Sequence, residues 1–327
     1  MTMIETTAIG VFGKAPWREE YIRLRTSGQP FAGFDAWLTE GVEWATARAG
    51  AAWDAGYRAG QIYAFAFRPP SAGRPIGAPG GAVLAGVVAP SADAAGRQFP
   101  LVVAVPFATR DCAGAPELLP LFLEPVWRLA SELLVDARIG DAARLEGRLE
   151  EARVDAEESL ADVAESYVDW RRSLPLAELF ALVYGDGSDR IAPHALRLVL
   201  ETVRPCLGVE QPKTSLTLRL PLGACGGAAV CFWIDLVRRA ARWKSTIPSF
   251  FWSHDGAAGN MLLHLGDPPR STLAELWAPT RERDELCDVT PPIEPRRAEL
   301  VPALPPDVAH LVATGDATIV ELLSLFG

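Results

Sequence analysis

The sequence lacks the patterns that mark secreted, membrane and metal-binding proteins. Its cysteines are odd in number, scattered and without a C-x-x-C pair, which fits a reducing compartment better than a disulfide scaffold or a zinc site. Residues 1–7 have neither a basic region nor an apolar core, so no signal peptide is apparent. No apolar run reaches the ~18 residues of a membrane span. We therefore expect a soluble, cytoplasmic protein.

Several motifs of catalysis and ligand binding are also missing. The net charge of −10 disfavours nonspecific binding to nucleic acid. Gly13-Lys14 is not followed by Ser or Thr and lacks the first glycine of a phosphate-binding loop. The acidic loop after Gly185 lacks the ligand ladder and closing Glu of a calcium loop. We expect no cofactor, no metal and no nucleic-acid partner.

An enzyme is the next class to weigh, because Ser91, Asp93 and one of the histidines would supply the residue types of a hydrolase. However, the sequence has no G-x-S-x-G elbow, and Ser91 follows a proline in an expected turn. We predict that the protein is not an enzyme. A hydrolase that uses Ser91 remains an alternative.

The order of apolar runs predicts the fold class. At 327 residues, 49% of them hydrophobic, the chain is long enough for two domains. The first half is predicted as strand, helix, three strands and helix, and a coarse echo follows in the second half. Short loops between consecutive strands favour an antiparallel meander. We predict two packed α/β units, the first with a mainly antiparallel, meandering sheet flanked by helices, loosely longin-like.

A long acidic helix is predicted from Asp141 to Asp169, which contain ten acidic residues against three arginines. Leucines, alanines, Val163 and Tyr167 recur along it at steps of four and three, forming a narrow apolar seam. The seam either packs on the protein's own domains or docks a partner helix. With this segment as connector, the predicted organisation is an N-terminal α/β domain (1–139), an acidic connecting helix (140–172) and a second α/β unit with a C-terminal helix (173–327).

The stretch Pro90–Pro100 lies between two buried apolar runs and is predicted as a structured loop. Ser91 and Asp93 are suited to bonding neighbouring backbone N–H groups, and Gly96 to a positive φ. Arg97 lies within reach of Asp93 across the turn, which predicts a charge-assisted pair. The loop is interpreted as structural, with recognition of a partner as the alternative.

Two helical segments carry further features. Asp35 is predicted as the N-cap of a helix whose apolar positions include Trp37. A second helix, 228–243, has a basic cluster near its end, at Arg238, Arg239, Arg242 and Lys244. These cations complement the helix dipole, so the cluster is not by itself a binding patch.

Four sequence segments together resemble one family. Gly10-Val-Phe-Gly-Lys-Ala-Pro16, Phe34-Asp-Ala-Trp-Leu38, the ordered P-S-x-D-x-x-G-R-x-F-P string of residues 90–100, and Pro248-Ser-Phe-Phe-Trp252 are similar to the TagF (ImpM) proteins of bacterial type VI secretion. The resemblance is clearest over residues 8–138. Where the family has a Gly-Asp-Phe segment, this chain has Arg18-Glu-Glu-Tyr21, so this loop is a candidate for altered partner specificity.

The resemblance implies a cytoplasmic regulator that represses the type VI secretion apparatus after translation by binding a forkhead-associated (FHA) scaffold protein. A structural or accessory subunit of the apparatus is the alternative, and the oligomeric state is not predicted. The candidate partner loop comprises Arg18, Glu19, Glu20 and Tyr21. The motif residues, interpreted as structural or as recognition residues, are Gly13, Lys14, Pro16, Trp37, Pro90, Ser91, Asp93, Gly96, Arg97, Phe99 and Pro100.

Overall fold

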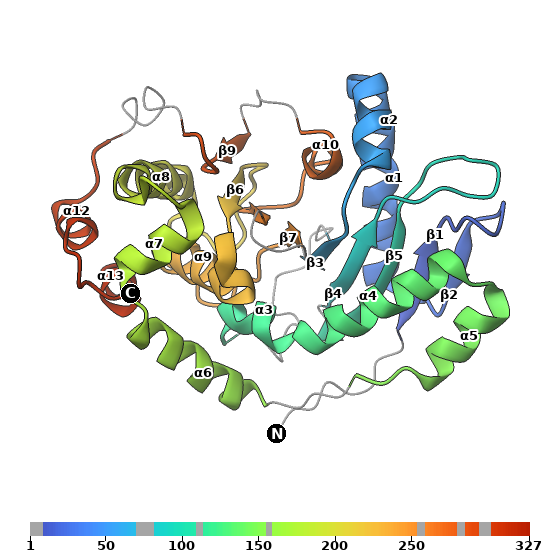
Figure 1. Cartoon of the computed structure of the whole chain (residues 1–327), viewed down its shortest axis with the longest axis horizontal. Helices are drawn as coiled ribbons and strands as arrows, with labels where there is room; N and C mark the ends of the chain where they lie inside the picture. The colour runs from blue at the N-terminus through green and yellow to red at the C-terminus, as the bar shows by residue number, and fades with distance from the viewer. Residues whose placement is uncertain are drawn as a thin grey trace.

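A nine-stranded sheet forms the centre of the computed structural model, which describes residues 9–69, 82–108, 114–154, 159–253, 259–279, 285–293 and 302–327 (Figure 1). The strand order is β2-β1-β5-β4-β3-β7-β8-β6-β9. All neighbouring strands are antiparallel except β6 and β9. The predicted fold class, a helix-flanked α/β protein with a mainly antiparallel sheet, is confirmed.

The elements alternate along the chain. The strands are β1 Gly10–Gly13, β2 Ile22–Leu24, β3 Tyr63–Phe67, β4 Ala82–Ala89, β5 Leu101–Ala108, β6 Thr217–Pro221, β7 Phe250–Ser253, β8 Asn260–His264 and β9 Leu286–Asp288. The helices are α1 Gln29–Ala49, α2 Ala51–Arg58, α3 Leu119–Phe122, α4 Glu124–Ile139, α5 Ala142–Glu151, α6 Leu160–Ser173, α7 Leu176–Tyr184, α8 Ser188–Val203, α9 Gly226–Ala240, α10 Thr272–Trp277, α12 Pro306–Ala313 and α13 Ile319–Ser324. Two short strands, β2 and β9, were not predicted.

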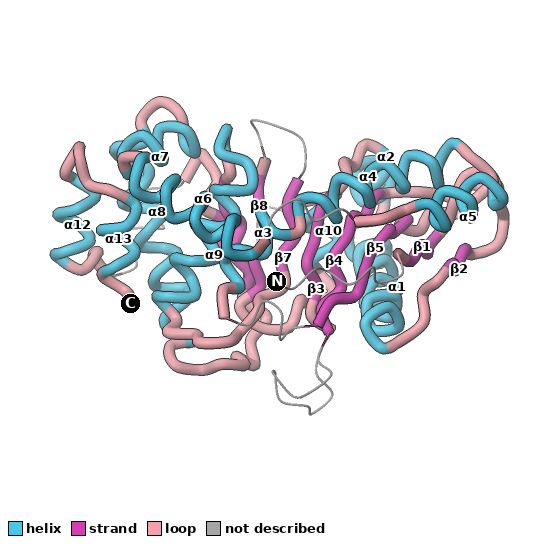
Figure 2. Tube along the Cα trace, turned by 90° about the horizontal axis from the view of Figure 1, so that it is seen from below, coloured by secondary structure: helices cyan, strands magenta, loops and turns pink. Residues whose placement is uncertain are grey.

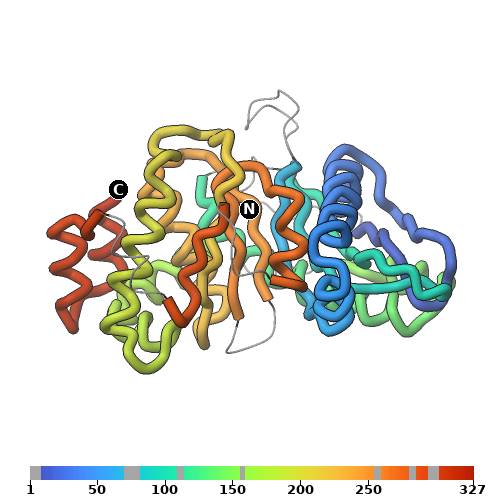
Figure 3. Tube along the Cα trace, turned by 90° about the horizontal axis from the view of Figure 1, so that it is seen from above, coloured from blue at the N-terminus to red at the C-terminus, as the bar shows by residue number. Residues whose placement is uncertain are grey.

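Both faces of the sheet are covered, which explains why β4 and β5 are continuous apolar runs. Alternate residues of β4 enter opposite core layers: Val83 and Val87 pack with α4 residues such as Trp127, and Leu84 and Val88 with the aromatic residues of α1. Figure 2 shows the strands of the sheet from the side on which α4 and α5 lie. Figure 3 looks from the opposite side, where α1 and α10 are in contact.

The two halves of the chain meet at β3 and β7, which pair from Tyr63 with Ser253 to Ala66 with Phe250. Every strand on one side of this junction precedes residue 140, and every strand on the other side follows residue 172. In each half, the first strand pairs with the last one of its meander, β1 with β5 and β6 with β8. The coarse echo expected from the sequence concerned the order of elements, which in the second half is β6, α9, β7, β8 and α10. The division into 1–139, 140–172 and 173–327 stays a prediction.

The acidic segment is not one long helix, contrary to the prediction. Helix α5 ends at Glu151, where the Arg153 guanidinium donates to the carbonyl oxygens of Glu150 and Ala152, at 2.7 and 2.8 Å. Helix α6 then starts with a capping box between Ser159 and Asp162. The apolar periodicity alone indicates one continuous helix, but local capping ends α5 and starts α6 within it.

The apolar seam of this acidic segment packs on the protein itself, the first of the two interpretations. Leu145, Leu149, Val163 and Tyr167 are buried in the main core, while Ala156 lies outside the described residues. Arginines hold the segment in place as well: Arg144 and Arg148 bind Asp136 of α4, at 3.1 and 2.8 Å, and Arg171 binds Asp235 of α9, at 2.8 Å.

An aromatic cluster secures the junction between the halves. Phe34 of α1 lies 4.5 Å from the Phe65 ring and 5.4 Å from the Trp37 ring, centroid to centroid. Trp37 stacks in turn on Phe251, 5.4 Å away, and its indole donates to the Pro268 carbonyl at 2.9 Å. The cluster thus includes residues from both sides of the β3–β7 pair.

We expect Phe34→Ala to lower the free energy of unfolding by about 3–5 kcal/mol, because the ring is fully buried and the space it leaves is walled by other rings. Urea unfolding measures the loss. Glu43→Ala, at an exposed position of the same helix, is the matched control and should change the stability by about 0.5 kcal/mol or less. A loss below about 1 kcal/mol for Phe34→Ala would contradict the packing described.

Candidate functional site

The stretch Pro90–Pro100, here called the motif loop, folds back on itself between β4 and β5. The Phe99 N–H donates to the Ser91 carbonyl at 3.1 Å, and the Asp93 N–H to the Arg97 carbonyl, also at 3.1 Å. Gly96, at the tip, has a φ of +80°, which confirms the expected positive φ. The loop is a small closed ring of backbone hydrogen bonds.

Asp93 fills the centre of this ring. Its Oδ1 accepts from the backbone N–H groups of Ala95 and Arg97, at 3.1 and 2.8 Å. Its Oδ2 accepts from Arg97 Nε at 2.7 Å and from Lys14 Nζ at 3.0 Å. The predicted Asp93–Arg97 pair is therefore present. The carboxylate is fully buried, whereas 61% of the Arg97 side chain stays exposed.

The environment of Asp93 stabilises its charged form. Removal from water raises the pKa of this carboxyl group, but the hydrogen bonds from Lys14 and Arg97 outweigh that effect and hold the pKa at about 2. A group whose pKa is lower in the folded than in the unfolded state stabilises the fold above its unfolded pKa, about 3.9 for Asp. This contribution is lost as the pH falls through the folded value.

Lys14 has a role that sequence reasoning missed, since nothing in the sequence paired it with Asp93. It follows β1, which pairs with β5 so that Gly13 lies opposite Leu101. This register brings Lys14 next to the end of the motif loop. Gly13 has a φ of +124°, and a Cβ built on it would lie 2.0 Å from the Pro100 carbonyl oxygen. Only glycine fits there.

The motif loop also fixes the predicted partner loop, residues 18–21. The Ala94 N–H donates to the Arg18 carbonyl at 3.0 Å, and Arg97 Nη2 to the Glu19 carbonyl at 2.7 Å. The bonds to this loop are to backbone atoms, so the side chains of Arg18, Glu19 and Glu20 remain exposed. Sequence reasoning named the two loops separately, and the structure brings them together.

Aromatic and helical contacts anchor both ends of the exposed turn. On one side, Trp17 Nε1 donates to the Ala137 carbonyl of α4 at 2.7 Å. On the other, the Tyr21 ring lies edge-on to Phe99, 5.3 Å between centroids. The Tyr21 hydroxyl donates to Asp35, and burial together with this bond raises the pKa of Tyr21 well above its ordinary value.

Asp35 is not the N-cap predicted from the sequence. Helix α1 begins earlier, at Gln29, with Pro30 in its first turn. Asp35 lies inside the helix and binds Tyr21 and Arg23, so it links α1 to the candidate site. Pro30 was the sequence signal for the earlier start.

The remaining motif residues have structural contacts. The Tyr57 hydroxyl donates to the Ser91 carbonyl and accepts from the Ser91 N–H, both at 3.0 Å, and Arg138 donates to the Pro90 carbonyl. Ser91 Oγ is buried and has no hydrogen-bonded base among the described residues. Pro16 is exposed beside the partner loop, and Trp37 lies in the aromatic cluster rather than at this site.

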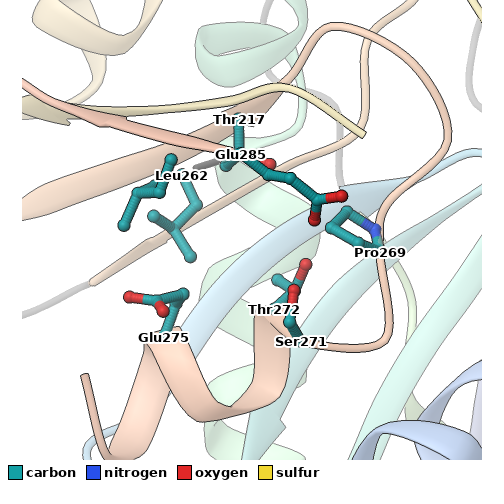
Figure 4. A pocket seen from close by; sticks show the side chains of 8 residues that line it. Thr217, Leu262, Pro269, Ser271, Thr272, Glu275 and Glu285 are labelled. Atoms are coloured by element: carbon teal, nitrogen blue, oxygen red, sulfur yellow. The ribbon is translucent and has the colours of Figure 1, made fainter. Parts of the chain in front are cut away.

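A second polar region lies between β6, β8 and α10, where Thr217, Leu262, Glu275 and Glu285 line a small cavity (Figure 4). Its volume is about 10 Å³, which is room for roughly one water molecule. The cavity is therefore too small for a substrate. Within the described ranges, no three His, Cys, Asp or Glu side chains are grouped so that they would hold a metal ion.

The fold and the candidate site define a class: a helix-flanked α/β protein in which an ion-paired loop presents a rigid, exposed turn. No helix in the described part of the chain is long and apolar enough to cross a membrane. Residues 10–152 match the family model of the TagF N-terminal domain, described as type VI secretion system-associated. The resemblance seen in the sequence is thereby confirmed over these residues.

The chain is also similar to solved structures. The crystal structure of PA0076 from Pseudomonas aeruginosa PAO1, at 2.05 Å resolution, aligns with 88% of this chain and 100% of that one. The sequence identity is 19% and the TM-score is 0.46. No curated protein matches the sequence.

We expect Asp93→Asn to lower the melting temperature at pH 7, because the amide leaves the charges of Lys14 and Arg97 without their counter-ion. The difference from the wild type should shrink as the pH falls from about 4 towards 2, where the native carboxylate is itself protonated. Thermal melting across this pH range is the measurement. Asp186→Asn, at an exposed position, is the control, and a pH-independent difference would contradict the ion-pair account.

Two glycine substitutions separate close packing from backbone conformation. Gly13→Ala should lower the free energy of unfolding by about 3 kcal/mol or more, because the new methyl group meets the Pro100 carbonyl. Gly96 also has a positive φ, but a Cβ built on it has no atom within 4 Å. We therefore expect Gly96→Ala to lower the free energy of unfolding by only about 1–2 kcal/mol. Urea unfolding of both variants gives the comparison, and equal losses would argue against the tight β1–loop contact.

Proposed function

We propose that this protein is a post-translational negative regulator of a bacterial type VI secretion system that acts in the cytoplasm by binding an FHA-domain scaffold protein. It is a binding protein and not an enzyme. The TagF N-terminal domain supplies the association with type VI secretion. The observation that carries the proposal is the exposed turn over residues 16–21. The motif loop holds its backbone, and the Trp17 side chain anchors it to α4.

The geometry of this turn suits recognition of a folded partner. The carbonyl groups of Arg18 and Glu19 accept hydrogen bonds from the motif loop, which reduces the conformational entropy that the turn would lose when a partner binds. Arg18 and Glu20 form an exposed pair, 2.9 Å between Nε and Oε2, and Glu19 and Arg97 add two further exposed charges. Such a mixed charge pattern favours specificity and orientation over affinity.

Exposed apolar side chains are available near this turn. Val135 and Ile139 lie one helical turn apart in α4 and are 48% and 70% exposed. The Ala137 carbonyl, which accepts the hydrogen bond from the Trp17 indole, lies in the same last turns of α4. Apolar groups next to ordered charges are the usual composition of a protein interface.

Binding is proposed to need no phosphorylation of this chain, although FHA domains typically read phosphothreonine. Thr290 is a poor acceptor for a kinase, because its hydroxyl donates to Asp288 Oδ1 at 2.6 Å and its side chain is half-buried. Thr6 and Thr7, the other candidates, lie outside the described residues. We propose that the contact is made by the folded surface.

The test is a pull-down of the FHA-domain scaffold by the unmodified recombinant chain. Replacing Glu19 and Glu20 together by Lys should weaken capture about tenfold or more, since it reverses two exposed charges without touching the backbone anchors. Glu40→Lys, an exposed charge reversal on α1, is the matched control and should leave capture unchanged.

Three results would contradict this proposal. Capture only after kinase treatment, with its loss in Thr6→Ala or Thr7→Ala, would overturn binding by the folded surface while sparing the partner. Co-purification with sheath or baseplate components instead of the scaffold would indicate a structural subunit. Turnover of a substrate that is lost in Ser91→Ala would indicate the hydrolase alternative.

A further inference from the structure

The second half of the chain contains an apolar groove that the proposed function does not use. Two adjoining cavities of about 310 and 340 Å³ share Leu207, Ala240 and Phe326. Their walls come from α8 and the turn after it, the end of α9, residues 302–305 and the end of the chain after α13. These elements lie at the opposite end of the molecule from β1, β2 and α5 (Figure 1).

Large apolar side chains are exposed at this groove. Leu207 is 49% exposed and Leu325 is 41% exposed, and both line it. Val209, 43% exposed, follows in the same turn, which the Gly208 N–H fixes by donating to the Ala241 carbonyl at 2.8 Å. Exposed apolar side chains that gather around a concavity are a mark of an interaction surface.

The charge of the groove is opposite to that of the protein. Its lining includes one acidic residue, Glu201, and four arginines, Arg197, Arg204, Arg239 and Arg242, whereas the whole chain has a net charge of −10. Glu201 binds Arg204 at 2.7 Å, and the side chains of the lining keep a balance of three positive charges. Within the described residues, Arg242 is exposed and forms no ion pair.

A buried carboxylate does not neutralise the groove. Asp235 accepts from Arg239 Nε at 2.6 Å but also from Arg171 Nη1 at 2.8 Å. One carboxylate is thus shared by two guanidinium groups, and one positive charge remains. The arginines near the end of α9, expected to serve the helix dipole, therefore contribute to a positively charged wall as well.

We propose that this groove binds an acidic amphipathic helix of a partner protein. The apolar face of the helix packs against Leu207 and Leu325, and its carboxylates meet Arg204 and Arg242, whose planar guanidinium groups suit carboxylates. A concave, apolar floor with a charged rim fits an inserted helix better than a flat membrane surface. This site is separate from the proposed FHA contact, so either one stands without the other.

The probe is a short, fluorescently labelled synthetic helix with leucines at i, i+3, i+4 and i+7 and glutamates on the opposite face. A second helix with lysines in place of the glutamates is its control. Fluorescence anisotropy with the full chain should show binding of the glutamate helix and at least about tenfold weaker binding of the lysine helix. Raising the salt concentration should weaken the first interaction.

Charge reversal locates the binding site. Arg204→Glu combined with Arg242→Glu should reduce binding of the glutamate helix about tenfold or more, and Arg48→Glu, an exposed reversal on α1, should leave it unchanged. Equal binding of both helices, or no effect of the double variant, would overturn the proposal. Two other results would also overturn it. If the wild type does not bind the glutamate helix but forms a dimer that the double variant cannot form, the groove binds a second copy of the chain. If the wild type binds anionic vesicles and the double variant does not, the groove binds lipid.

Discussion

The pairing of β3 with β7 is the interaction on which the rest of the structure depends. It joins four residues of the first half to four of the second and so makes one sheet from two meanders. Both core layers run across this junction. One includes Trp127 and Trp252, whose ring centroids are 4.0 Å apart, and the other includes Phe34 and Phe251. Without this pair, β3 and β7 would each be an unpaired edge strand of its own half.

The buried carboxylate of Asp93 organises the surface at the end of the molecule where β1 and β5 lie. Burying a carboxylate is unfavourable unless it is paired and hydrogen-bonded, and Asp93 has two cations and two backbone donors. These bonds connect Lys14, which follows β1, to the motif loop. Their consequence is a turn whose backbone is fixed and whose charged side chains face outwards, which is the arrangement that a recognition surface needs.

The acidic segment shows the same use of arginine. Its helices carry most of the local negative charge, yet they dock through Arg144, Arg148 and Arg171, which bind Asp136 and Asp235. The hydrogen bonds from Arg148 and Arg144 lower the pKa of Asp136, so that this contact also favours the charged form. Cations at the packed face and carboxylates on the outside let an acidic segment lie against the core without repulsion.

The sequence alone determined the properties that depend on local patterns. Alternation and apolar runs predicted β3, β4 and β5, and the spacing of Asp93, Gly96 and Arg97 predicted their turn and ion pair, because these groups are neighbours along the chain. It did not reveal the break between α5 and α6, where capping competed with periodicity. Nor did it reveal the early start of α1, which Pro30 signalled. Lys14 on Asp93, Arg97 on the Glu19 carbonyl and the arginine-lined groove were decided only by the tertiary structure. These contacts join residues far apart in sequence, and strand register and helix docking, which no local pattern encodes, bring them together.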